Sequence, residues 1–295
     1  MIGTAEASVL PTVPKAHVGS HWHQRQRVIR AIARQEIQDA VFGWSLYLTA
    51  TLACLVGALL LTNAVRAVSA SGLEVVSRPF FFPLLLAISL AALYLGGWAA
   101  LAIARPRDQG ALRVLFFAPV DPAALIAGHA LSGVLLSVLF LLVAVPIFLL
   151  LGLLVNLPFP PSLFIGLLAA PAFVAPAIGI GLFISALAPS ARSAMFLFAA
   201  VLAALVVVQA GYGALAQVPP TTRYYDALLF LREVLRVVRE ALQWLSPLAL
   251  LSEGLDAAFR ADWREVAALA LLGLAGAALW LWLAAWALTR RGVLP

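Results

Sequence analysis

The side chains best suited to directed polar contacts gather in one short segment, residues 105–122, which reads RPRDQGALRVLFFAPVDP. This segment holds three arginines and two aspartates, although the stretches on either side of it are almost free of charge. Neither it nor the rest of the chain offers a nucleophile with an adjacent base or a pair of catalytic carboxylates. The charged segment is therefore better suited to binding another molecule than to catalysis, and we predict that the chain is not an enzyme.

Local sequence predicts how this charged segment folds. Residues 109–117 can form a short helix that presents Leu112, Leu115 and Phe116 on one side, with Arg113 elsewhere. The PVDP sequence then stops the helix, because Asp121 can cap the next helix and proline suits its first position. A simpler reading is a positively charged anchor that fixes membrane orientation, which would need the arginines but not this ordered helix and turn.

The remainder of the chain is too apolar for a water-soluble protein. It has 295 residues, of which 64% are hydrophobic and 11% are charged, whereas soluble proteins carry about 25% charged residues. A membrane-spanning helix needs about 20 mainly apolar residues, and the long uncharged runs supply six of them. We predict an all-α polytopic membrane protein with spans near residues 42–65, 80–104, 123–155, 162–187, 193–216 and 266–289.

Arginines are distributed unevenly between the two sides of these spans. The short loops on the side opposite the N-terminus hold only Arg66 and Arg78, and the six arginines of segment 217–264 are balanced by acids. Since basic residues accumulate in cytoplasmic loops, we expect both termini in the cytoplasm and segment 217–264 outside. The ten arginines on the N-terminal side are Arg25, Arg27, Arg30, Arg34, Arg105, Arg107, Arg113, Arg192, Arg290 and Arg291.

Two further elements flank or interrupt the six-span domain, residues 42–295. Residues 1–23 read as a mobile cytoplasmic tail, and residues 24–41 as a cytoplasmic interfacial helix that leads into the first span. The external segment contains an amphipathic helix, which we favour as a packing element over an outer gate. Its apolar positions are Leu228, Leu231, Leu235, Val238, Leu242 and Leu245, and Arg236 can pair with Glu240 one turn on.

Several kinds of chemistry are disfavoured by residue usage. Lys15 is the only lysine, so the chain cannot contain a G-x-x-x-x-G-K-[ST] phosphate-binding loop, and any ATP hydrolysis must come from another polypeptide. No charged residue lies near the middle of a predicted span, which disfavours a proton-coupled carrier. His21 and His23 form too small a set for us to assign a metal site. The arginines are better explained by membrane orientation than by a nucleic-acid partner.

Glycines in the fourth predicted span indicate close helix packing. Gly179 and Gly181 lack side chains and allow a neighbouring helix to approach.

The charged segment resembles that of a known family, the permease subunits of type-2 ABC (ATP-binding cassette) transporters, including the multicopper-enzyme-maturation-like branch. Those permeases carry a motif like E-x-E-x-G-T-L-x-x-L-L-x-x-P-V, followed by G-K. Pro106, Ala111 and His129 depart from it, standing in place of an acid, Thr and Lys. The resemblance extends to ARQEIQDA, GLFISALAPSARSA and SPLALLSEGLDAAFRADW. The residues that match the motif are Asp108, Gly110, Leu112, Leu115, Pro119, Val120 and Gly128.

This resemblance implies a function for the charged segment. Such permeases pair as homodimers or heterodimers in a membrane, expected here to be the bacterial cytoplasmic membrane, and work with separate cytoplasmic ATPase subunits that bind the ATP. Their first cytoplasmic loop acts as a coupling helix pushed by the ATPase. We therefore expect an ABC transporter permease with no cofactor of its own and lipids around it. We expect export, or mechanical use of ATP energy, rather than uptake, because the sequence shows no docking domain for a substrate-binding protein. The residues expected to couple to the ATPase are Arg105, Asp108, Leu112, Arg113, Leu115, Phe116, Pro119 and Asp121.

An alternative function is a non-transporting membrane scaffold or an assembly factor for a membrane or copper enzyme. A stand-alone secondary carrier is a third possibility, which the uncharged spans disfavour.

Overall fold

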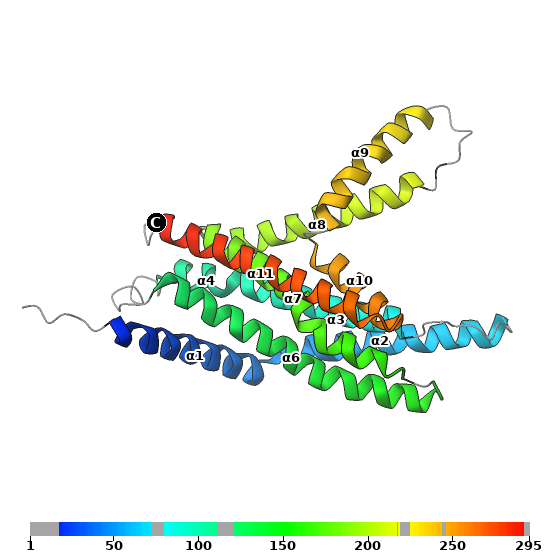
Figure 1. Cartoon of the computed structure of the whole chain (residues 1–295), viewed down its shortest axis with the longest axis horizontal. Coiled ribbons are helices and arrows are strands. Elements are labelled where there is room, and N and C mark those ends of the chain that lie inside the picture. The colour runs from blue at the N-terminus through cyan, green and yellow to red at the C-terminus, as the bar shows by residue number, and fades with distance from the viewer. Residues whose placement is uncertain are drawn as a thin grey trace, which may run out of the picture.

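The structure is a computed structural model that describes residues 18–71, 80–110, 121–157, 159–216, 218, 225–243 and 246–291. All regular structure within these residues is α-helical (Figure 1). The helices are α1 (Val18–Phe42), α2 (Trp44–Ser71), α3 (Phe81–Ala102), α4 (Ala104–Asp108), α6 (Pro122–Leu154), α7 (Ser162–Leu187), α8 (Ala191–Ala216), α9 (Tyr225–Gln243), α10 (Pro247–Phe259) and α11 (Trp263–Arg291).

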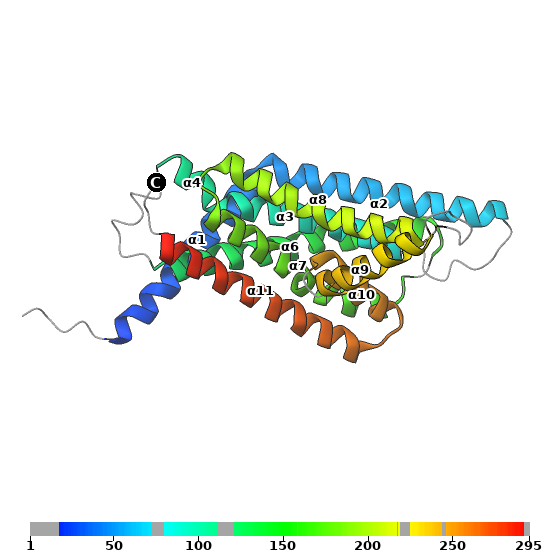
Figure 2. The ribbon, with the colours of Figure 1, turned by 90° about the horizontal axis from the view of Figure 1, so that it is seen from above.

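Six of these helical stretches are long and apolar enough to cross a membrane, which confirms the predicted fold class. They are α2, α3 with α4, α6, α7, α8 and α11, and they run along the long axis of the molecule (Figure 2). The predicted span 162–187 has the same limits as α7, and the other predicted spans differ from their helices by a few residues at most ends. A helix is the required form here, because a backbone inside a bilayer must satisfy its own hydrogen bonds.

Helix α7 lies at the centre of the bundle. It packs against α3, α6, α8, α10 and α11, and most of its residues are buried. The predicted close approaches at its glycines are confirmed. A Cβ atom on Gly181 would lie 2.2 Å from the carbonyl oxygen of Gly96 in α3, and one on Gly179 would lie 2.9 Å from Cβ of Trp280 in α11. Neighbouring backbones can come this close only because a side chain is missing.

The external segment holds two helices with different surroundings. Helix α9 packs on the end of α8, and this hairpin leans away from the other helices (Figure 1). Arg236 of α9 pairs with Glu233, at 3.1 Å from Nε to Oε2. The side chain of its predicted partner, Glu240, lies outside the described residues, so that pair stays a prediction. Helix α10, which the sequence did not separate from this segment, is buried against α3, α7 and α11, with Gly254 facing the ring of Phe173.

Helix α1 is longer than the interfacial helix predicted for residues 24–41. It begins at Val18, so residues 18–23 are helical although we had assigned them to the tail. The last proline before this helix is Pro14, and no residue between it and Val18 would stop a helix. Residues 1–17, the rest of that predicted tail, lie outside the described part of the chain.

The Gly181 contact generates a prediction. Gly181→Ala should destabilise the bundle by about 1–3 kcal/mol, because the added methyl group forces apart two backbones. Gly276→Ala in α11 is the matched control, since its Cβ would meet only Cγ of Pro176 at 4.0 Å. The melting temperatures of both variants in detergent check this, and equal melting temperatures would show that the α3–α7 contact is not tight.

Candidate functional site

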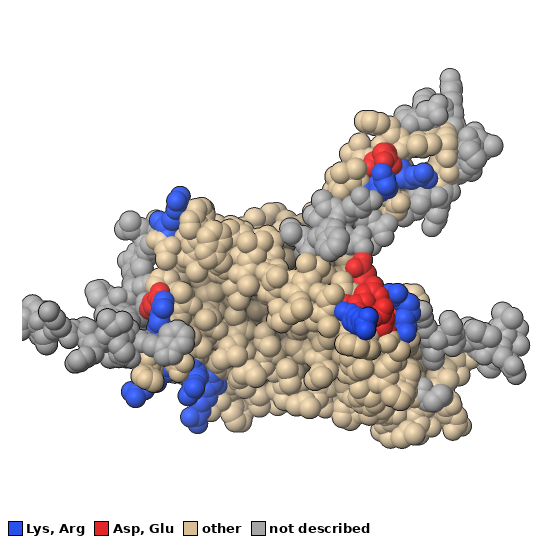
Figure 3. Space-filling view, viewed as in Figure 1, with Lys and Arg blue, Asp and Glu red and all other residues tan. Residues whose placement is uncertain are grey.

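Charged side chains lie at the two ends of the bundle, and the visible face between them carries none (Figure 3). At one end, which we call the basic end, lie the start of α1, α4, the start of α6 and the end of α11 (Figure 1). At the other end, Arg260 is paired with Asp256 at 3.0 Å and with Glu265 at 2.9 Å. The acids neutralise that arginine, whereas the basic end keeps an excess of arginine.

The predicted coupling segment, residues 105–121, begins in α4 at the basic end. Gln109 and Gly110 form the turn that ends α4, and the positive φ of 74° at Gly110 is a conformation that favours glycine. The predicted helix over 109–117 therefore cannot start at Gln109. Arg105 and Asp108 are exposed on α4. The remaining predicted coupling residues before Asp121 lie outside the described residues: Leu112, Arg113, Leu115, Phe116 and Pro119.

Helix α4 is attached to the end of α7. The guanidinium of Arg107 donates hydrogen bonds to the carbonyl oxygens of Ala188, at 2.6 Å, and Ala186, at 3.3 Å. The buried hydroxyl oxygen of Ser185 accepts from the backbone N–H groups of Ile103 and Ala104, each at 2.9 Å. These contacts satisfy carbonyl groups that a helix end leaves open and N–H groups at the α3–α4 break. The coupling segment therefore starts from a fixed point on α7.

Asp121 is fixed at the other end of the same segment. Its side chain caps α6 by accepting a hydrogen bond from the N–H of Ala123 at 3.1 Å, and Pro122 occupies the first turn, as predicted. The same carboxylate forms an ion pair with Arg25 of α1. Arg25 thus joins the beginning of α1 to the beginning of α6.

Two deeper contacts continue this attachment of α1 to α6. Gly128 of α6 leaves room for Ile32 of α1, whose Cβ would lie 2.9 Å from a Cβ added at Gly128. One residue further, Nδ1 of the buried His129 lies 3.4 Å from Oε1 of Glu36. No described atom forms a hydrogen bond with that nitrogen. The three contacts follow one another in the same order along both helices, so α1 and α6 start in the same direction.

Burial at this interface changes the acid–base behaviour of Glu36. The pKa of its carboxyl group rises from 4.5 to about 7, first because burial disfavours the ionised form and second because Asp39 is nearby. The other charged or titratable side chains of α1 that lie among described residues are His23, Arg25, Arg27, Arg30 and Arg34. Those on the helices packed against α1 are Asp121 and His129 of α6, and Tyr47, Cys54 and Arg66 of α2.

Two serines close the turn between α7 and α8 with hydrogen bonds. The N–H of Ser190 donates to the hydroxyl of Ser193 at 3.1 Å, and the N–H of Ser193 reaches the hydroxyl of Ser190 at 3.3 Å. These reciprocal bonds resemble a capping box at the start of α8. This turn, the α4 attachment and the start of α6 together form the surface that the basic end offers around the coupling segment.

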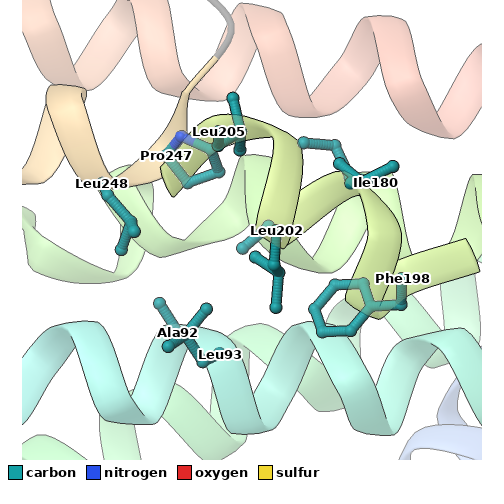
Figure 4. A pocket seen from close by; sticks show the side chains of 10 residues that line it. Ala92, Leu93, Ile180, Phe198, Leu202, Leu205, Pro247 and Leu248 are labelled. Carbon is teal, nitrogen blue, oxygen red and sulfur yellow. The ribbon is translucent and has the colours of Figure 1, made fainter. Parts of the chain in front are cut away.

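A small apolar crevice lies deeper in the bundle, between α3, α7, α8 and α10 (Figure 4). Its volume is about 20 Å³, close to the space of a single water molecule. Leu202 and Phe198 of α8 face Ala92 and Leu93 of α3 across it. Every side chain that lines it is apolar, so the crevice suits hydrocarbon rather than a polar solute.

Sequence reasoning missed the partners that hold the coupling segment. In the sequence, Arg107 is one of ten arginines on the N-terminal side of the spans, and Glu36 and His129 belong to separate motifs. Glu36 precedes the first predicted span and His129 lies near the start of the third, so both are expected near the same membrane surface. A single sequence does not tell which helices are in contact.

Comparison with known families identifies a matching family model. A family model described as ABC-2 type transporter matches residues 27–242, which is well over half of the chain. The match runs from α1 through α9 and includes the whole coupling segment. No curated protein matches the chain.

The half-buried carboxyl group of Glu36 generates a pH prediction. Because the pKa of Glu36 is higher in the folded state than in the unfolded state, its contribution to stability is complete below pH 4.5 and is lost as the pH rises to about 7. Glu36→Gln, which stays neutral, should therefore melt above the wild type at pH 7.5 by more than it does at pH 4.5. Glu233→Gln, at an exposed acid of α9, is the control and should show no such difference. A pH-independent gap between Glu36→Gln and wild type would contradict the raised pKa.

Proposed function

The chain belongs to the ABC-2 type transporter family, and from this premise we propose that it is the permease of an exporter driven by a separate cytoplasmic ATPase. Membership makes it the membrane component of an ABC transporter, a class that works with an ABC ATPase. Within the family, the motif between Asp108 and Gly128 favours the multicopper-enzyme-maturation-like branch. The observation that carries the proposal is the double attachment of the coupling segment.

The two attachments lead to different parts of the bundle. At its start, Arg107 connects the segment to α7, the central helix. At its end, Asp121 connects it to α6 and, through Arg25, to α1. A push on the residues between these points is therefore delivered to the bundle centre and to the α1–α6 pair together. We propose that ATP-driven movement of the ATPase enters the permease by this route.

Apolar residues should dominate the docking contact within the segment. Burying one large apolar side chain contributes roughly 1.5–3 kcal/mol, whereas an exposed ion pair contributes about 0–1 kcal/mol. Leu112, Leu115 and Phe116 would therefore provide affinity, and Asp108 and Arg113 would orient the partner. ATP is bound by the partner subunit in this proposal.

We further propose that two permeases pair, as identical copies or as paralogues. Helix α8 supports this, because only 11% of its candidate span is buried within the described chain, the smallest share of the six.

The proposed topology gives a labelling prediction. In a Cys54→Ala background, Arg239→Cys on α9 should react with an impermeant maleimide added to intact cells. Arg192→Cys, at the exposed start of α8 at the basic end, should react only after the cells are opened. The reverse pattern would place the basic end outside and remove the route to a cytoplasmic ATPase.

The docking prediction tests the coupling segment itself. Leu115→Asp or Phe116→Asp should abolish copurification of the ATPase with the tagged permease and the ATP hydrolysis that accompanies it. The cause is that a carboxylate replaces an apolar contact at the interface. Val237→Asp, at an exposed apolar position of α9 at the far end, is the matched control and should retain the ATPase.

Folding must be intact in each variant, which a single symmetric size-exclusion peak and an unchanged melting temperature establish. If correctly folded Leu115→Asp and Phe116→Asp proteins still retain the ATPase and its activity, the segment is a topological anchor and the coupling role is wrong.

A further inference from the structure

Helix α1 carries a stripe of arginines on the side opposite to its contact with α6. At about 100° per residue, Arg27, Arg30 and Arg34 fall within about 60° of one another around the helix. Arg25 and Ile32, which touch α6, lie on the opposite side. Because those contacts fix how α1 is rotated, the stripe must face away from the bundle.

The stripe is exposed and carries positive charge without a described counter-charge. All three side chains are exposed. The ion pairs among described residues use other arginines, and α1 has acids only at Glu36 and Asp39, which lie on the α6-facing side of the helix. Figure 3 shows blue atoms on the outer flank of the bundle beside α1.

The depth of the stripe places it at a membrane surface. Helix α6 has 33 residues, which corresponds to about 50 Å, or roughly 20 Å more than the hydrocarbon core of a bilayer. Its first turns, which α1 accompanies, therefore reach the headgroup layer. From Arg27 to Arg34 the helix rises only about 10 Å, and α1 is inclined to the bundle axis (Figure 2).

Direction separates a lipid partner from a protein partner. A subunit that docks at the end of the bundle would approach along its axis, towards Gly110 and Asp121, the two described residues between which the coupling segment runs. The stripe instead faces sideways, along the flank where the surrounding bilayer lies. Arginine forms two parallel hydrogen bonds with a phosphate group and remains charged at all physiological pH values.

We propose that Arg27, Arg30 and Arg34 form a binding surface for the phosphate groups of anionic lipids in the leaflet at the basic end. Under the proposed topology this is the cytoplasmic leaflet. Bound headgroups would hold α1 at the membrane surface, and through Arg25 and Asp121 they would set the height of the coupling segment. The binding surface itself does not depend on the transport function.

Lipid binding to the purified permease, without any ATPase, tests this proposal. The test variant is Arg27→Gln/Arg30→Gln/Arg34→Gln. The control, Arg192→Gln/Arg264→Gln/Arg290→Gln, removes the same charge from three exposed arginines elsewhere. Native mass spectrometry measures retention of phosphatidylglycerol relative to phosphatidylcholine in mixed micelles. We expect the test variant to lower this ratio at least about fivefold and the control to change it little.

Three results would overturn the proposal. The first is a test variant that retains phosphatidylglycerol as the wild type does. The second is an equal loss in both variants, which would mean that diffuse charge rather than the stripe attracts the lipid. The third is a test variant that retains the lipid but no longer copurifies with the ATPase, which would assign the stripe to the protein partner. A melting curve of each variant confirms that the fold is kept.

Discussion

The approach of the α3 backbone to the α7 backbone is the contact on which the other helices depend. Gly181 makes it possible, because any side chain there would collide with the carbonyl oxygen of Gly96. Helix α7 can then stand at the centre, with α6, α8, α10 and α11 around it. At its end, Ser185 and Arg107 hold the α3–α4 break at a fixed height. The position of the start of the coupling segment is therefore determined by the packing of α3 against α7 at Gly181.

The end of the coupling segment depends on a second contact, between α1 and α6. Three contacts follow one another along the two helices. They are the ion pair of Arg25 with Asp121, the packing of Ile32 on Gly128, and the contact of Glu36 with the buried His129. Removing water from Glu36 favours its neutral form, so this interface is more stable in mild acid than above neutrality. The same contacts fix the rotation of α1 and so determine which of its residues face away from α6.

Features governed by local chemistry could be predicted from the sequence. The spans follow from uncharged length, the cap at Asp121 from its proline neighbour, and the packing at Gly181 from the missing side chain. Features that need a distant partner could not. Arg107 is one of many arginines until Ala186 and Ala188 are seen beside it. Helix α10 has 13 residues, which is too short for a membrane span. Its sequence therefore does not show that it is buried rather than part of the external segment.

The most direct test asks whether α1 and the start of α6 move as one body when the complex uses ATP. Spin labels at Ala31→Cys and Leu131→Cys, both exposed, report the α1–α6 distance in a Cys54→Ala background. A second pair, Ala31→Cys with Phe196→Cys on α8, reports movement against the bundle. Pulsed electron resonance with and without ATP should show an unchanged first distance and a changed second distance. A change in the first distance as large as that in the second, or no change in either, would contradict transmission through the α1–α6 pair.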